Sequence, residues 1–162
     1  MHGMSTQAQR DEMPVGVSFV ALALRETGPR GSICEIGAVD VRGGRVVASR
    51  VWGGPDFDVV AGFEAAREFA GSRFIVAHDG VYVARSLADA YFVRGYAAPT
   101  MAYLCSLLMC RGEFPAADYS LPATAARLGI DLHDGAPVLE QAHVTATLVL
   151  DMARRWRAIS LE

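Results

Sequence analysis

The chain has 162 residues, of which 52% are hydrophobic, and a formal net charge of −3. This length and apolar content are enough to bury a core, so we expect one folded domain. The negative charge argues against a strongly basic nucleic-acid binder, and no apolar run is long enough to form a membrane-spanning helix.

The first fourteen residues, MHGMSTQAQRDEMP, are polar, and we expect them to form a disordered leader that carries no secretion signal. A single domain is then expected over residues 15–158, with a short tail at 159–162. Its first three elements have the β-branched and aromatic composition of strands, separated by turn-forming residues at 26–31 and at Gly43-Gly44. These strands are expected at Val15–Leu24, Ile33–Val41 and Arg45–Trp52.

The rest of the domain alternates helices with short strands. Apolar spacing and capping residues predict a helix after Asp56 or Asp58 as far as Ala70, a strand at Phe74–Ala77 and a helix at Val81–Arg94. A short strand near Met101–Tyr103 is then expected to lead into a helix through Met109, followed by a loop at 112–119. The last two elements expected are a short helix from Ser120 through Leu128 and a long helix at Pro137–Trp156. Three meandering strands followed by two parallel ones predict an α/β domain with a mixed five-stranded sheet flanked by helices. Ribonuclease-H-like folds share this order.

Three cysteines, Cys34, Cys105 and Cys110, lie in apolar stretches. Their odd number fits reduced thiols in a cytoplasmic protein, and no second pair of Cys or His has the spacing of a zinc site. We therefore expect all three to be buried as small apolar side chains.

Four segments carry a resemblance to a known family when they are taken in order and with their spacing. They are FVALALRETG with ICEIGAV (19–28 and 33–39), IVAHDGVYVARSL (75–87), YSLPATAARLGIDL (119–132) and QAHVTATLVL (141–150). Together they resemble the DEDD-type (DnaQ-like) 3′-to-5′ exonucleases, the family that includes the proofreading epsilon subunit of bacterial DNA polymerase III. The resemblance covers nearly the whole chain after residue 15 and implies the exonuclease variant of the ribonuclease-H-like fold.

The same resemblance indicates where the family's chemistry would lie. Members hold two magnesium ions with four carboxylates and use a histidine as general base. The corresponding positions here are Ala23, Arg25, Val83, Ala136 and Gln141, and all five lack the required group. Alanine and valine have no ligand atom, glutamine offers a neutral amide, and arginine places a cation where a metal ion would bind. The resemblance therefore predicts a catalytically inactive, degenerate site.

A rewired metal site is the alternative that the remaining acids leave open. Glu26 follows Arg25 directly, but side chains alternate along a strand, so we expect it to point to the opposite face. Glu26, Asp79 and Asp134 are the acids that could form such a site, and only then would magnesium or manganese be a cofactor.

Other residues near these motifs have both a structural and a functional interpretation. His78 is expected to be a hydrogen-bonded structural histidine. Arg25 is expected either to pair with Glu35 or Asp79, or to bind a phosphate directly. Tyr82 can stack on bases or pack at the rim of the core.

Trp52, beside Gly53-Gly54-Pro55, either marks an interface or covers the core.

Three functions are left open by these residues. The leading one is an inactive exonuclease-like domain that binds a protein partner or a second copy of itself. The second is a nucleic-acid binder that does not cleave its ligand and that uses the old substrate groove, with Arg25 on a phosphate. The third is an active metal-dependent 3′-to-5′ exonuclease with a rewired site. No membrane partner is expected.

Overall fold

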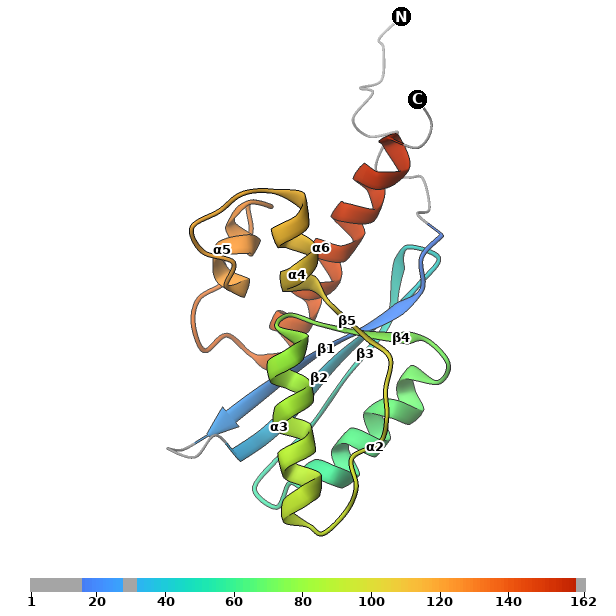
Figure 1. Ribbon diagram of the computed structural model, residues 1–162, viewed down its shortest axis with the longest axis vertical. Coiled ribbons are helices and arrows are strands. Elements are labelled where there is room, and N and C mark those ends of the chain that lie inside the picture. Colours follow the sequence, from blue (N-terminus) through green and yellow to red (C-terminus); the bar gives the residue numbers. More distant parts are fainter. Residues whose placement is uncertain (1–15, 28–31, 160–162) are drawn as a thin grey trace, which may run out of the picture.

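The computed structural model describes residues 16–27 and 32–159, and its strands form one mixed five-stranded sheet (Figure 1). The order across the sheet is β3-β2-β1-β4-β5. The strands are β1 (Phe19–Thr27), β2 (Ser32–Arg42), β3 (Arg45–Gly53), β4 (Phe74–Ala77) and β5 (Tyr103–Cys105). β2 is antiparallel to both β1 and β3, whereas β4 is parallel to both β1 and β5. The predicted sheet is therefore confirmed.

Helices cover both faces of this sheet (Figure 1). They are α2 (Val59–Ala70), α3 (Gly80–Val93), α4 (Ser106–Glu113), α5 (Leu121–Ala126) and α6 (Val138–Ile159). One core cluster joins α6 and its neighbours α4 and α5 to the sheet residues that include Ala21, Ala23 and Val39. The other joins α2 and α3 to the opposite sheet face, where Leu22 and Ile36 are buried. Alternate residues of β1 thus face different helical layers.

Small residues let α6 approach the sheet closely. Ala142 and Ala146 of this helix are fully buried. A methyl group on the Cα atom of Gly37 in β2 would lie 2.8 Å from the carbonyl oxygen of Val138, which leaves no room for a side chain. The first turn of α6 therefore packs directly on the backbone of β2, opposite Ala23 of β1.

The ends of several elements differ from the predicted ones. β1 begins at Phe19 and continues through Thr27, because its polar end still pairs with β2 through the backbone. Backbone pairing does not depend on side-chain polarity, so reading Glu26 and Thr27 as turn residues was wrong; Gly28–Gly31 lie outside the described residues. The α2 cap is Asp58, whose carboxylate accepts hydrogen bonds from the Val60 and Ala61 amides.

The region after α3 shows the largest shifts. β5 lies at Tyr103–Cys105, later than expected, since its place is set by pairing with β4. α4 extends to Glu113, and α5 already ends at Ala126. α6 reaches Ile159, just beyond the expected domain end at residue 158.

Three further expectations can be compared with the structure. The leader at 1–14 and residues 160–162 of the tail lie outside the described residues. All three cysteines are free thiols, but only Cys110 is buried, whereas Cys34 and Cys105 are partly exposed. The expectation that all three are buried was therefore wrong for Cys34 and Cys105. Among the described residues no helix combines the length and apolarity needed to cross a membrane.

Candidate functional site at the carboxyl end of the first strand

The first motif occupies the carboxyl half of β1. Ala23 is buried there, opposite Gly37. Arg25 lies directly opposite Glu35 of β2, and its Nε is 3.0 Å from Glu35 Oε2. The two side chains are 45% and 27% exposed, so the ion pair is open to solvent on one side. Of the two ion pairs expected for Arg25, the structure shows the one with Glu35.

Glu26 points to the opposite side of the sheet, as strand alternation predicts. The register of β1 and β2 shifts between Arg25 and Glu26, so Glu26 faces Ile33. Its carboxylate lies at the same pocket as the Tyr82 hydroxyl on α3, and its proximity raises the pKa of the Tyr82 phenol. Arg25 therefore lies on the α6 side with Ala23, whereas Glu26 lies on the α3 side.

At the second motif, Val83 packs into the core at the position where the resemblance implied a metal ligand. Val83 is buried in the core cluster beneath α3 and lines a small apolar pocket of about 90 Å³ with Leu22, Phe63 and Leu87. A valine in these surroundings offers no atom to a cation, and a carboxylate would be costly to bury there without a partner.

His78 uses both ring nitrogens in hydrogen bonds to the protein. Its Nε2–H donates to the carbonyl oxygen of Tyr119 over 2.7 Å, and the Ser106 hydroxyl donates to Nδ1 over 2.9 Å. A carbonyl can only accept, so Nε2 carries a proton, and in the neutral imidazole Nδ1 is then the acceptor for the Ser106 hydroxyl. Burial lowers the pKa of His78 below its ordinary value of 6.5. The contacts match the structural interpretation, and sequence reasoning missed both partners because each lies on a distant segment.

Asp79 and Asp134 occupy ordinary polar positions. Asp79 caps α3 in a left-handed conformation, at φ 54°, and its carboxylate accepts from the Tyr82 amide over 3.4 Å. Asp134 is exposed in the loop before α6. Asp79 therefore serves as a helix cap, and Asp134 lies at the surface in a different segment.

Ala136 and Gln141, the remaining two of the five positions, lie at the start of α6 and contact each other through the backbone of Ala136. Ala136 is fully buried. Gln141 on the first turns of α6 donates from Nε2 to the Ala136 carbonyl oxygen over 2.8 Å. The Gln141 amide therefore provides a hydrogen-bond donor for the Ala136 carbonyl group, which lies just before α6. Ala23 and Ala136 belong to one core cluster, so the chain that enters α6 packs near the carboxyl half of β1.

These residues do not fit a pair of magnesium ions. Magnesium requires oxygen ligands, chiefly carboxylates and water, at close to octahedral geometry. The five positions provide two alanines, a valine, an arginine already bound to Glu35 and a glutamine bound to backbone. Over residues 16–27 and 32–159 no three side chains of His, Cys, Asp or Glu come together as a possible metal site. Glu26, Asp79 and Asp134 are thus not assembled into one.

Two surface pockets lie next to α2, one near each end of that helix. A pocket of about 510 Å³ lies next to Glu26 and Tyr82, between α2 and α3, and Arg85, Arg94 and Asp89 line it. Arg94 is paired with Asp58 at 2.9 Å. The pocket therefore combines both signs of charge.

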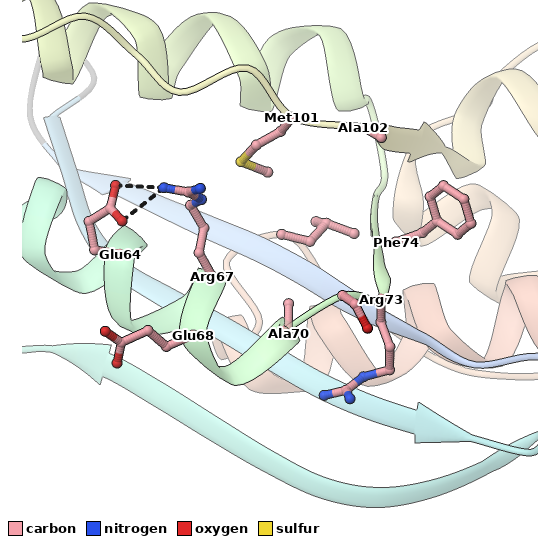
Figure 2. A pocket seen from close by; sticks show the side chains of 11 residues that line it. Glu64, Arg67, Glu68, Ala70, Arg73, Phe74, Met101 and Ala102 are labelled. Carbon is pink, nitrogen blue, oxygen red and sulfur yellow. Dashed lines mark hydrogen bonds and ion pairs between the residues drawn. The ribbon is translucent and has the colours of Figure 1, made fainter.

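The second pocket, of about 380 Å³, lies at the amino end of β4 (Figure 2). Figure 2 shows Glu64 and Arg67 of α2 hydrogen-bonded to each other on one side of the pocket, with Met101 on the opposite side. In α/β sheets ligands bind at the carboxyl ends of the strands. This pocket lies at the other end, away from the motif residues.

Comparisons with known proteins give a similarity of fold. No family model matches this chain, and no curated protein matches it by sequence. Among solved structures it is similar to Exonuclease X in complex with 5′ overhanging duplex DNA, at a TM-score of 0.59 and 19% identity, over 83% of this chain and 90% of that one. The chain therefore has an exonuclease-like fold of the ribonuclease-H-like kind.

Proposed function

We propose that this exonuclease-fold domain does not cleave nucleic acid and acts by binding a protein partner. The observation that carries the proposal is the Arg25–Glu35 ion pair, at 3.0 Å, in the place of the first motif. Glu35 is the carboxylate beside that position, and the guanidinium already neutralises it. A divalent cation would have to displace Arg25 and then lie next to its positive charge.

The other replaced positions support the same proposal independently. Val83 and Ala136 are packed in apolar surroundings, and the Gln141 amide is held by a backbone carbonyl. Reversing one of these changes would not restore four converging carboxylates. Binding without cleavage is therefore the function that the site supports best, since fold alone does not determine activity.

A nucleic acid is the second candidate ligand, and the exposure of Arg25 favours it. Its side chain is 45% exposed, and a guanidinium has five N–H donors in a geometry that suits phosphate. The solved relative is described as a complex with duplex DNA. Against this candidate stand the net charge of −3 and the existing pairing with Glu35.

A nuclease assay tests the proposal most directly. We expect the purified full chain to leave labelled single-stranded DNA and RNA intact with Mg²⁺ or Mn²⁺, at the level of an EDTA control. Trimming that EDTA abolishes and that persists through further purification would overturn the proposal. If Glu26→Gln or Asp79→Asn then removed the trimming, the rewired exonuclease would be the correct function.

A binding assay separates the two binding candidates. We expect weak binding of labelled single-stranded DNA, with no change on Arg25→Ala. The matched control is Arg154→Ala, an exposed arginine about 20 Å along α6 from Gln141. Salt-dependent binding that Arg25→Ala abolishes and Arg154→Ala preserves would support the nucleic-acid candidate instead.

A further inference from the structure

Two arginines lie over stacked aromatic rings where α4 leads into α5. The Phe114 and Tyr119 rings are stacked, with centroids 5.9 Å apart and an interplanar angle of 26°. The Arg127 guanidinium lies over the Phe114 ring, 3.8 Å from its centroid, and the Arg111 guanidinium lies over the Tyr119 ring at 5.5 Å. Together these four side chains form the arginine–aromatic cluster.

The rings of this cluster are firmly held, although they flank a loop. Both pack against the core cluster that joins α6 to the sheet. The Tyr119 hydroxyl donates to the Phe114 carbonyl oxygen over 2.8 Å and accepts from the Ala116 amide over 2.9 Å. The Tyr119 carbonyl oxygen also accepts the hydrogen bond from His78. The two arginines therefore lie over supports that are tied to the rest of the fold.

Both arginines have donors to offer to a ligand. Arg111 and Arg127 are exposed, and neither has an ion pair or hydrogen bond with any residue that the structure describes. A guanidinium carries five N–H donors, and its attraction to a ring does not use them as a carboxylate would. Because each side chain is already held over a ring, less conformational freedom is lost when an anion binds.

The segment 111–127 contains two acids, and both are bonded elsewhere. Glu113 accepts a hydrogen bond from the Trp156 indole of α6. Asp118 accepts from the amide and the hydroxyl of Ser120, each over 2.8 Å, and these bonds lower the pKa of its carboxyl group. The acids of this segment therefore do not neutralise its two arginines.

The charge pattern fits a few carboxylates better than a nucleic-acid backbone. Polynucleotides gain affinity from many cationic contacts with closely spaced phosphates. Here one acid directly precedes each ring residue in the sequence, and the whole chain has a net charge of −3. Bases also stack on open aromatic faces, whereas a guanidinium already lies over each of these rings. A short acidic peptide can place single carboxylates on the two arginines and avoid the neighbouring acids.

We propose that the arginine–aromatic cluster binds an acidic segment of a protein partner, with a partner carboxylate on each of Arg111 and Arg127. This inference rests on the proposed protein-binding function, for which it supplies the surface and the chemistry of the partner. The two fail separately: metal-dependent cleavage would overturn the proposed function, whereas only peptide binding tests the cluster.

Fluorescence anisotropy of a labelled hexaglutamate peptide, titrated with the full chain up to roughly 500 μM, tests the proposal. We expect saturable binding that salt weakens and that the double variant Arg111→Gln, Arg127→Gln weakens by at least about tenfold. The control is the double variant Arg45→Gln, Arg85→Gln, which removes two other exposed arginines, from β3 and α3. Circular dichroism confirms that both variants fold. An absence of wild-type binding, or equal weakening by the two variants, would overturn the proposal.

Two single changes test the aromatic support while keeping both positive charges. Phe114→Leu removes the ring under Arg127, and Arg127→Lys replaces the guanidinium at an exposed position, where the fold tolerates it. Each should weaken hexaglutamate binding by about threefold, the size of an exposed cation–π contact. Phe92→Leu, which changes an 81% exposed phenylalanine of α3, is the control and should bind as the wild type does. Unchanged binding in both test variants would overturn the role of the rings.

A labelled hexathymidylate tests the other source of anions. We expect it to bind more weakly than hexaglutamate in the same buffer, because two arginines beside two acids neutralise few phosphates. Equal or tighter binding of the oligonucleotide, lost in the double variant Arg111→Gln, Arg127→Gln, would assign the cluster to phosphate and overturn the protein partner.

Discussion

The paired strands β1 and β2 carry an arginine–carboxylate cluster near each end, and the two clusters differ in burial. At the carboxyl end of β1, Arg25 and Glu35 lie 3.0 Å apart with side chains 45% and 27% exposed. Toward the other end, the Asp40 side chain is 2% exposed and contacts two arginines. Similar chemistry thus occupies a half-open site and a closed one.

The buried cluster is held from three segments. Arg42 follows Asp40 on β2, with Nη2 2.9 Å from Asp40 Oδ2, whereas Arg73 lies just before β4 and contacts Oδ1 from Nε at 3.0 Å. Arg73 also donates to the Phe69 carbonyl oxygen over 2.7 Å. Arg73 Nη2 donates a hydrogen bond to Asp40 Oδ2 over 3.2 Å, whereas the contact between Arg73 Nε and Asp40 Oδ1 is an ion pair without a hydrogen bond.

The difference shows which cluster is tied to the fold. Removing one partner of a buried pair leaves an unpaired charge out of water, whereas an exposed pair is solvated with or without its partner. The cluster around Asp40 therefore fastens β2 to the turn before β4. Arg25 and Glu35 carry little of the fold's stability, and their position can serve binding.

The largest expected effect comes from breaking the buried cluster. Asp40→Ala should lower the free energy of unfolding by about 3 kcal/mol, the lower end for a broken buried pair, because Arg73 remains 20% exposed. Urea unfolding measures it. Asp40→Asn should lose less, since the amide oxygen still accepts from the arginines. A loss below about 1 kcal/mol for Asp40→Ala would place this cluster in the same class as Arg25–Glu35.

His78 is a second buried polar group, and it tests whether burial decides how much such a group contributes to the free energy of unfolding. Its folded pKa is lowered by burial, so the unfolded chain binds the proton more readily below pH 6.5. Stability should be complete above that pH and fall as the pH decreases, by up to about 1.4 kcal/mol per unit until the folded pKa is reached.

Unfolding measured between pH 5 and pH 8 shows this slope, which His78→Gln should remove. His133→Gln, in an exposed loop, is the control and should keep it. An unchanged slope in His78→Gln would assign the pH dependence to another group.

Most of the sheet could be predicted because its strands have a local signal. Apolar β-branched runs gave β4 its bounds and placed the middle of β1, β2 and β3 correctly. The ends could not be predicted in this way, because Glu26 and Thr27 are held in β1 by backbone pairing with β2. β5 was misplaced for the same reason, since pairing with β4 selects three residues from a longer apolar run.

For the site, the sequence alone predicts which groups are absent from the positions that the resemblance singles out, because residue identity is local information. Partners are not local. His78 binds Ser106 and Tyr119, which are 28 and 41 residues away. Asp40 and Arg73 are 33 residues apart, and an acid inside an apolar strand was the signal that could have flagged the buried cluster. Arg25 had two possible partners until the strand register placed it opposite Glu35.

The smallest expected effect concerns that exposed pair. Arg25→Ala, Glu35→Ala and the double variant should each change the free energy of unfolding by less than about 1 kcal/mol, and the coupling energy of the cycle should be about 0.5 kcal/mol. The physical reason is solvent, which screens both charges in the folded state and replaces the lost contact.

High salt should reduce this coupling further, and urea unfolding at low and at high salt measures both values. Asp40→Ala is the internal reference, since salt screens a buried pair much less. A coupling above about 2 kcal/mol would mean that Arg25 fastens β1 to β2 as firmly as Asp40 fastens β2 to β4. Arg25 would then be needed for the fold and could not be released to a ligand. A small coupling leaves the guanidinium free to exchange Glu35 for a partner's carboxylate or a phosphate at little cost to stability.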